Sequence, residues 1–215
     1  MGSHRRELKW ILASASPRRK MILRRLGLRF IIDPSGIEEP DRHPNEKISR
    51  YAMRVARLKA EETAQRHKSG IVLAADTIVV LGNNILGKPQ NRAAARRMLK
   101  HLSGRWHEVI SGICLLECMH RRTRIAFSRT RVHFCRLSPA EIEWYLRSGE
   151  YRDKAGAYGA QGRASIFIDK IDGCFFNVVG FPVAAFGKLC RKAGIDLTDQ
   201  LSAISRPQKG SGYFA

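Results

Sequence analysis

Hydrophobic positions along the chain follow two periods, one typical of strands and the other of helices. Short apolar runs and stretches rich in β-branched or aromatic residues predict strands at residues 8–13, 28–33, 71–80, 106–116, 123–136 and 166–171. Apolar residues three or four positions apart predict helices at residues 17–26, 45–67, 92–102, 139–147 and 182–193. The run 71–80 is interrupted by the polar pair Asp76 and Thr77, so it is read either as one strand or as two short strands.

Capping residues mark the ends of several of these helices. Asn91 can accept a hydrogen bond from the free N–H groups of the helix that follows it, and Ser138 with Glu141 forms a capping box. Gly149 stands where a helix is expected to end, because glycine readily adopts the left-handed conformation of a helix C-cap. The glycine-rich stretch 149–162 is expected to be a loop.

The chain is long enough to bury its own core. It has 215 residues, of which 44% are hydrophobic, and such a domain needs no disulfide or structural metal for stability. Residues 8–201 are expected to form one domain. Residues 1–7, which begin with a stretch that resembles a remnant of an expression vector, and residues 202–215 are expected to be disordered.

The cysteines and the apolar runs indicate a cytoplasmic protein. The five cysteines form no CxxC pair, and an odd number fits poorly with a disulfide framework, so we expect reduced thiols. No apolar run approaches the ~20 residues of a membrane span, and the apolar segment near the N-terminus is too short for a secretory signal. We therefore expect a soluble protein that does not bind a membrane.

The formal net charge of +20 is the unusual bulk property of the chain. It predicts attraction to polyanions such as nucleic acids, anionic membranes or phosphorylated substrates, and it does not choose among them. The basic clusters are dispersed over several predicted elements, which favours a generally basic surface over one specific nucleic-acid groove.

The turn between the first predicted strand and the first predicted helix carries hydroxyl and guanidinium groups. Ser14, Ser16, Arg18 and Arg19 lie there, where the free N–H groups of a helix start and the helix dipole favour an anion. Such a turn is either a phosphate cradle or a solvated, well-capped helix start, and the motif alone does not decide between them.

Charged residues elsewhere also point to chemistry. Asp76 interrupts an apolar strand, where a carboxylate is costly to bury unless it is paired, protonated or bound to a metal, so we infer a metal or catalytic role. The acidic loop pair Glu38 and Glu39 offers a second ligand, although acidic loop residues are usually only solvated. The spacing of Lys59 favours a snorkelling side chain that covers the core. Lys88 lies in a turn, where a basic residue needs no special role.

Six short blocks resemble the motifs of the Maf family, in the same order along the chain. They are Leu12–Arg19 (LASASPRR), Gly36–Glu39 (GIEE), Ala75–Thr77 (ADT), Gly87–Pro89 (GKP), Asp153–Tyr158 (DKAGAY) with Gln161–Gly162, and Asn177–Pro182 (NVVGFP). Each block is modest, but their order and spacing over residues 12–182 are far more specific than any one of them.

The resemblance implies an α/β fold akin to that of inosine triphosphatases, with a mixed sheet in two lobes that flank a cleft, usually as a homodimer. It implies a pyrophosphatase that cleaves a nucleoside triphosphate into the monophosphate and pyrophosphate. Contacts to the triphosphate are then implied for Ser14, Arg18 and Arg19, and phosphate clamps for Lys59 and Lys88. For Lys59 this replaces the snorkelling interpretation.

The same resemblance implies a divalent cation, Mg²⁺ or Mn²⁺, organised by Glu39 and Asp76. Asp76 also resembles the general base favoured in the family. One carboxylate cannot obviously combine this role with tight metal ligation, so both roles stay open.

The stretches around Thr77 and Gln161 are similar to the branch of the family that acts on dTTP and UTP, and Arg18 matches a further specificity position. A glutamine amide can pair with the carbonyl and N–H edge of a pyrimidine, and a threonine hydroxyl can add one more bond. The chain departs from the usual pattern at Tyr151 and at Cys174–Phe175, which bears on loop rigidity and substrate fit but not on the phosphate or metal groups.

Two other classes of function stand beside the enzyme. A nucleic-acid-binding module is motivated by the net charge and by the arginines of residues 121–131, although the aromatic residues are not interleaved with them as stacking platforms require. A regulatory protein of septum formation, which the family's name suggests, would use the fold without relying on turnover. Nucleotide hydrolysis by the purified protein, with and without Mg²⁺, separates the enzyme from both.

Overall fold

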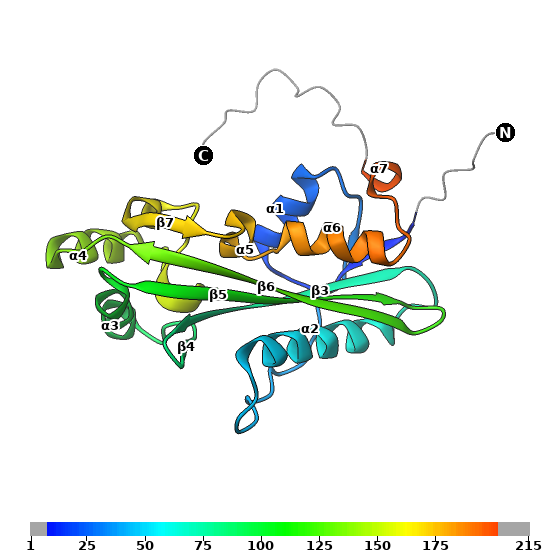
Figure 1. Ribbon diagram of the computed structural model, residues 1–215, viewed down its shortest axis with the longest axis horizontal. Coiled ribbons are helices and arrows are strands. Elements are labelled where there is room, and N and C mark those ends of the chain that lie inside the picture. The colour runs from blue at the N-terminus through cyan, green and yellow to red at the C-terminus, as the bar shows by residue number, and fades with distance from the viewer. Residues whose placement is uncertain (1–7, 202–215) are drawn as a thin grey trace, which may run out of the picture.

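A computed structural model of the chain describes residues 8–201, so the predictions for residues 1–7 and 202–215 lie outside the described residues. A seven-stranded mixed sheet forms the centre of the molecule, with helices on both of its faces (Figure 1). The strand order is β2-β1-β3-β5-β6-β7, and β4 also pairs with β3. The predicted α/β class with a mixed sheet is confirmed.

The six predicted strands are found, although the first two are shorter than predicted, and a short strand at residues 84–86 was not predicted. They are β1 (Trp10–Leu12), β2 (Ile31–Ile32), β3 (Ile71–Leu81), β4 (Asn84–Leu86), β5 (Trp106–Glu117), β6 (Arg122–Phe134) and β7 (Ile168–Asp172). β1 pairs in parallel with β2 and β3, and the other pairs are antiparallel. The run 71–80 is one strand, because Asp76 and Thr77 continue the ladder opposite Gly112 and Ser111.

The five predicted helices are also found, with caps where the sequence placed them, and two short helices at residues 175–179 and 197–200, which were not predicted, come in addition. They are α1 (Pro17–Arg25), α2 (Ile48–Ala64), α3 (Arg92–Leu102), α4 (Pro139–Ser148), α5 (Phe175–Val179), α6 (Val183–Lys192) and α7 (Leu197–Gln200), with 3₁₀ turns at Ala155–Ala157 and Arg163–Phe167. The Asn91 side chain accepts a hydrogen bond from the Ala94 N–H at 2.8 Å, and Ser138 and Glu141 form the predicted capping box. None of the described helices is long and apolar enough to cross a membrane.

Side chains of β3 alternate between the two faces of the sheet, as in any strand. Val72, Ala74, Ile78 and Val80 pack on the α2 side, where Gly112 of β5 lets the helix backbone come close: a Cβ at this position would collide with the Ala52 carbonyl. Leu73, Ala75 and Val79 face the other side. Asp76 therefore lies on the α2 face and Thr77 on the opposite face.

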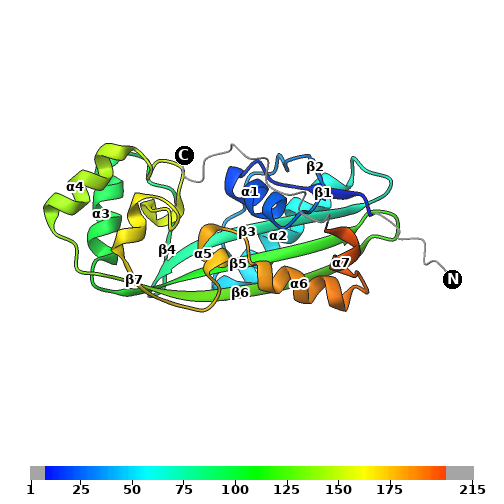
Figure 2. The ribbon, with the colours of Figure 1, turned by 90° about the horizontal axis from the view of Figure 1, so that it is seen from above.

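The hydrophobic core is divided along the length of the sheet, which gives the molecule two lobes (Figure 2). One cluster packs α1 and α6 against β1 and β3, with Phe181 and Phe186 fully buried. Another packs α3 and α4 against the far ends of β5 and β6, around Phe134 and Phe167. The long strands β5 and β6 run through both lobes and hold them together.

A gap along one edge of β3 separates the lobes. β5 pairs with the other edge of β3 over almost its whole length. On the edge with the gap, β1 pairs only as far as Leu73, and β4 pairs only from Val79 onward. Within the described residues no strand covers this edge between those two positions. Asp76 and Thr77 lie in the middle of the gap.

Candidate active site

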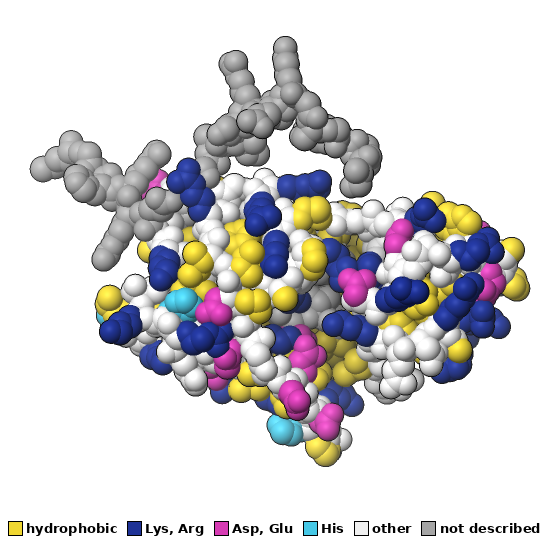
Figure 3. Space-filling model, turned by 180° about the vertical axis from the view of Figure 1, so that it is seen from behind, with side chains coloured by type: hydrophobic (Ala, Val, Ile, Leu, Met, Phe, Trp, Pro, Cys, Tyr) yellow, Lys and Arg dark blue, Asp and Glu magenta, His cyan; other side chains and the backbone are white. Residues whose placement is uncertain are grey.

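A cleft of about 780 Å³ opens at this gap, between the two lobes. Figure 3 shows the hollow, with acidic and basic side chains around it. Its lining includes every residue that the sequence predicted for the site: Ser14, Arg18, Arg19, Glu39, Lys59, Asp76, Thr77, Lys88 and Gln161. The fold thus brings together residues that are spread over almost 150 positions of the chain.

The turn from β1 to α1 supplies a buried hydroxyl and a guanidinium to the cleft. Ser16 caps α1, since its side chain accepts a hydrogen bond from the Arg19 N–H. The Ser14 hydroxyl is buried and lies 3.1 Å from Nη1 of Arg19. Arg19 Nε donates to the Gly180 carbonyl at 3.0 Å. The turn is therefore a well-capped helix start, and at the same time it aims a fixed guanidinium into the cleft.

Arg18 reaches across to the other lobe. Its Nη1 atom lies 3.2 Å from Oδ2 of Asp153, in the segment after α4, and Lys154 contacts the other oxygen of the same carboxylate at 2.6 Å. The Arg18 side chain is 31% exposed and that of Asp153 is 61% exposed, so this ion pair adds little stability. Arg18 can therefore exchange Asp153 for another anion at small cost.

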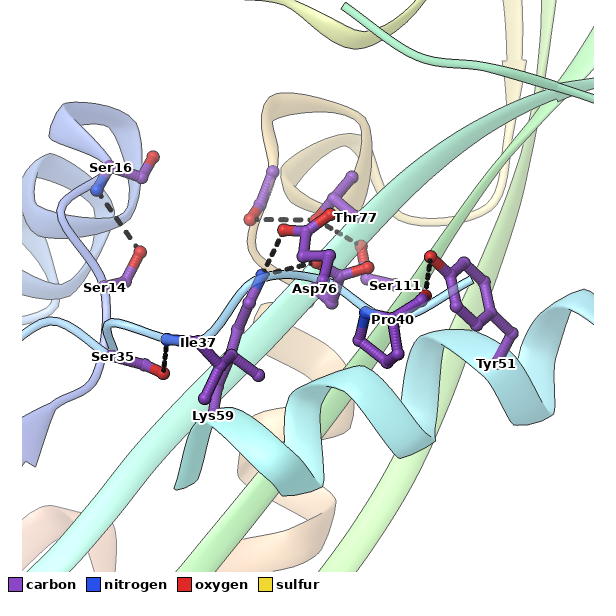
Figure 4. Close-up of polar contacts among 12 residues, drawn as sticks. Ser14, Ser16, Ser35, Ile37, Pro40, Tyr51, Lys59, Asp76, Thr77 and Ser111 are labelled. Atoms are coloured by element: carbon purple, nitrogen blue, oxygen red, sulfur yellow. Dashed lines mark hydrogen bonds and ion pairs between the residues drawn. The ribbon is translucent and has the colours of Figure 1, made fainter. Parts of the chain in front are cut away.

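Lys59 joins two carboxylates on the α2 side of the sheet. Its Nζ atom lies 2.6 Å from Oε1 of Glu39 and 2.8 Å from Oδ1 of Asp76, as Figure 4 shows for the latter pair. The ammonium group thus lies inside the cleft and is paired with two carboxylates. Spacing along the helix correctly placed Lys59 on the inner face, but it could not show that two acidic partners converge there.

The charges around Glu39 keep it ionised. Partial burial pushes its pKa upward, but the hydrogen bond from Lys59 and the positive charges of Lys59, Lys88 and Arg19 together hold the pKa below its ordinary value. Burial lowers the pKa of Arg19, and the negative charges of Asp76 and Glu39 oppose that shift. The positive and negative side chains of the cleft therefore stabilise one another in their charged forms.

Thr77 is the centre of a second network, on the opposite face of β3. Its hydroxyl lies 3.3 Å from Nη2 of Arg19, 3.3 Å from the Gly180 carbonyl and 2.8 Å from the Ser111 hydroxyl (Figure 4). Adjacent residues of one strand thus serve two parts of the site, because Asp76 meets Lys59 while Thr77 meets Arg19.

Lys88 and Gln161 approach the cleft from the second lobe, and both side chains are exposed. A hydrogen bond of 3.1 Å from the Gly156 N–H to the Gly87 carbonyl ties together the two segments that carry them. Behind Gln161, the Tyr158 hydroxyl contacts Nε2 of the buried His107 at 2.7 Å. The segment around Gln161 is thereby anchored to β5.

Sequence reasoning missed two members of the site. Ser111 interrupts an apolar strand much as Asp76 does, and this polar position in a buried run was the available signal. Gly180 belongs to a block that was recognised, but its contribution is a backbone carbonyl, which no side-chain pattern reveals.

Comparison with known proteins agrees with this geometry. The Maf family, described as Maf-like protein, matches residues 9–193 of the chain. The chain belongs to the Maf family. Among its relatives are proteins named dTTP/UTP pyrophosphatase from Syntrophomonas wolfei (47% identical, covering 84% of this chain and 96% of the relative) and Myxococcus xanthus (44% identical, covering 87% and 93%). A third, from Caldicellulosiruptor saccharolyticus, has the same name and is 40% identical, covering 88% of this chain and 96% of the relative.

Glu39 and Asp76 are the acidic pair that would hold the divalent cation implied by the Maf resemblance. Among the described residues no three His, Cys, Asp or Glu side chains come together as a metal-binding group. Glu39 and Asp76 nevertheless converge on one cation, the Lys59 ammonium. Two carboxylates suit Mg²⁺, which commonly takes only one or two from the protein and fills its other positions with water and substrate phosphates. The residues present therefore fit such an ion.

Proposed function

We propose that this protein hydrolyses dTTP and UTP to the monophosphate and pyrophosphate. The observation that carries the proposal is the single cleft in which Arg18, Arg19, Lys59 and Lys88 surround the acidic pair of Glu39 and Asp76. The Maf relatives named dTTP/UTP pyrophosphatase support the reaction and the substrates.

The cationic side chains are assigned to the triphosphate. Phosphoryl-transfer catalysis depends mainly on positioning and on neutralising charge in the transition state, and fixed guanidinium and ammonium groups do both. Arg19 is held by Ser14 and Gly180, so it binds a phosphate with little loss of side-chain freedom. Arg18 leaves Asp153 to bind a second phosphate, and Lys59 and Lys88 complete the clamp.

The acidic pair is assigned to the reacting water and the cation. Bound Mg²⁺ or Mn²⁺ would supply Lewis-acid polarisation of the α-phosphate. Glu39 and Asp76 would hold it, and Lys59 orients both carboxylates. Asp76 is also the assigned general base: it accepts a proton from the water that attacks the α-phosphorus, while the bond to the pyrophosphate oxygen breaks. Activity measured against pH at saturating metal separates its two roles.

Selection of the base is assigned to Arg18, Thr77 and Gln161. The exposed Gln161 amide offers a donor and an acceptor to a pyrimidine edge, and a base that cannot match both leaves one of them unpaired. Thr77 contacts three protein groups, so it contributes to base recognition by exchanging its hydrogen bond to the Gly180 carbonyl for one to the base, while its contacts with Arg19 and Ser111 stay in place.

We also propose a homodimer, as the Maf resemblance implies. The cysteine pattern and the dispersed basic clusters favour a cytoplasmic protein without specific nucleic-acid or membrane partners. Light scattering over a range of protein concentrations tests the dimer. A mass that stays at one chain throughout would contradict it.

A panel of nucleoside triphosphates tests the reaction itself. Purified protein is incubated with UTP, dTTP, CTP, GTP and ATP, with Mg²⁺ or with excess EDTA, and the products are separated. We expect pyrophosphate and monophosphate, fastest from UTP and dTTP, and little product with EDTA. Lys88→Ala should lower the rate for every substrate, whereas Lys100→Ala, an exposed lysine outside the cleft lining, should not. Release of inorganic phosphate alone, or no turnover, would contradict the proposal.

A further inference from the structure

Ser111 lies directly beneath the cleft without lining it. It is fully buried in β5, and in the antiparallel ladder it stands opposite Thr77 of β3. A hydroxyl group that is fully buried among the apolar residues of this part of the strand is costly unless it is hydrogen-bonded. The partner of Ser111 is the Thr77 hydroxyl, 2.8 Å away.

The hydrogen bonds around Thr77 give the direction of this contact. A hydroxyl group donates one hydrogen and can accept two. The Arg19 guanidinium is only a donor, and the Gly180 carbonyl is only an acceptor, so Thr77 accepts from the first and donates to the second. Its remaining lone pair is left for Ser111, which must then be the donor. All three positions on the Thr77 oxygen are filled.

Arg19 is held by the same arrangement. Its three nitrogen atoms contact the Gly180 carbonyl, the Ser14 hydroxyl and the Thr77 hydroxyl. Ser111 fixes the rotation of the Thr77 hydroxyl, and Thr77 in turn holds Nη2 of Arg19. Without Ser111, the single Thr77 proton is free to turn away from Gly180, and the guanidinium loses one of its fixed supports.

We infer that Ser111 is a positioning residue, which acts through Thr77 to hold Arg19 in place for the phosphates of the substrate. The inference rests on the proposed function and extends it to a residue below the cleft surface. Because Arg19 is assigned to the phosphates, loss of the Ser111 hydroxyl weakens all nucleoside triphosphates equally and leaves the preference for pyrimidines unchanged.

The test is a cycle of variants at Ser111 and Thr77. Ser111→Ala should raise KM for UTP and for GTP by the same factor, about fivefold for one neutral hydrogen bond, with a smaller effect on kcat. In the Thr77→Val background, which lacks the relaying hydroxyl, Ser111→Ala should have no further effect. In the Thr77→Ser background, which keeps a hydroxyl at residue 77, Ser111→Ala should again raise KM about fivefold. Independent, multiplying effects in the Thr77→Val background would overturn the inference.

Ser128→Ala is the matched control, because Ser128 lies opposite Ser111 on β6 and outside the cleft lining. It should leave KM unchanged. Thermal unfolding of each variant shows whether it is folded at the assay temperature, and loss of UTP selectivity in Ser111→Ala would count against the phosphate role.

The affinity for inorganic pyrophosphate, measured by calorimetry with Mg²⁺, tests the effect of Ser111 on Arg19 without turnover. Ser111→Ala should weaken it about fivefold, again only when residue 77 carries a hydroxyl. If the unmodified protein hydrolyses no nucleotide, the proposed function fails, while the pyrophosphate affinities still decide the role of Ser111. Unchanged affinity in folded Ser111→Ala, or no binding by the unmodified protein, overturns the inference.

Discussion

Two neighbouring residues of β3 divide the work of the cleft. Strand geometry turns the Asp76 side chain to one face, where it meets Lys59, and the Thr77 side chain to the other, where it meets Arg19. Both line the cleft at the edge of β3 that no described strand covers. The single peptide bond between Asp76 and Thr77 therefore fixes the position of the acidic pair relative to Arg19.

Asp76→Asn should reduce kcat by at least about a hundredfold with little effect on folding, because a near-isosteric amide removes both basicity and attraction for a cation. Glu39→Gln should have the same direction of effect. The measurement is kcat for UTP with saturating Mg²⁺, with circular dichroism to verify the fold. Near-normal turnover by folded Asp76→Asn would rule out the assigned centre.

Gln161→Ala should change selectivity more than overall rate. Removing the amide lifts the penalty on bases that cannot pair with it, so the ratio of kcat/KM between UTP and GTP should fall by about tenfold or more. Lys88→Ala is the comparison variant, because it should lower kcat/KM for UTP and for GTP by the same factor. If Gln161→Ala lowers all five nucleotides by one factor, the pyrimidine assignment loses its physical basis.

His107 should make the protein less stable in mild acid. Burial lowers its pKa from 6.5 to about 4, so between these values the unfolded chain binds a proton that the folded protein does not. As the pH falls through this window, the free energy of unfolding should decrease by on the order of 3 kcal/mol from this residue alone. Urea unfolding of the unmodified protein and of His107→Gln at pH 7, 5.5 and 4.5 measures it. Equal pH dependence in both proteins would contradict the assignment.

Individual residues were predictable where they broke a local pattern. Asp76 was found from sequence because a charge in an apolar strand demands an explanation, and the structure provides Lys59 as its partner. The role of Lys59 could not be read from helical spacing, because Glu39 and Asp76 come from a loop and a strand outside its helix. The Maf motifs, not the spacing, placed Lys59 in the site.

At the scale of elements, long periodic segments were predictable and several short ones were not. β5, β6 and α3 were placed within a few residues because their patterns extend over several turns or pleats. β4, α5 and α7 have three, five and four residues, which is too short for a period to register. β2 is shorter than predicted, since only Ile31 and Ile32 pair, and both side chains are exposed.

The approach of α2 to the sheet should control the position of Lys59. Gly112→Ala would place a methyl group against the Ala52 backbone, and the helix must shift, which costs about 1–3 kcal/mol as overpacking does elsewhere. Because Lys59 lies two turns further along the same helix, kcat should fall together with Tm. Kinetics with UTP and thermal unfolding measure both.

The control is Gly187→Ala in α6, where the nearest atom to an added Cβ is the Arg191 side chain at 3.7 Å. It should leave kcat unchanged and stabilise the helix by up to about 1 kcal/mol. Normal kcat and normal Tm in Gly112→Ala would show that α2 does not need its close contact with the sheet at this position.

For the molecule as a whole, the net charge of +20 should produce weak and unspecific binding to nucleic acids. Dispersed lysines and arginines meet phosphates but read no bases, so affinity should be independent of sequence and should fall steeply with salt. Fluorescence anisotropy with several labelled DNA and RNA oligonucleotides, between 50 and 300 mM KCl, measures it, and UTP hydrolysis should be less sensitive to salt. Tight binding of one sequence at physiological salt would favour the nucleic-acid interpretation.

The gap in β3 also bears on how the protein stays clear of aggregation. A strand edge with unpaired N–H and C=O groups is a template on which a foreign chain can add a strand. Here β1 and β4 limit its length, and the uncovered stretch is recessed between the lobes beside Asp76 and Arg19. An incoming strand would have to enter the cleft and displace the paired charges that line it. The charged groups assigned to catalysis therefore also hinder the addition of a foreign strand to the edge of β3.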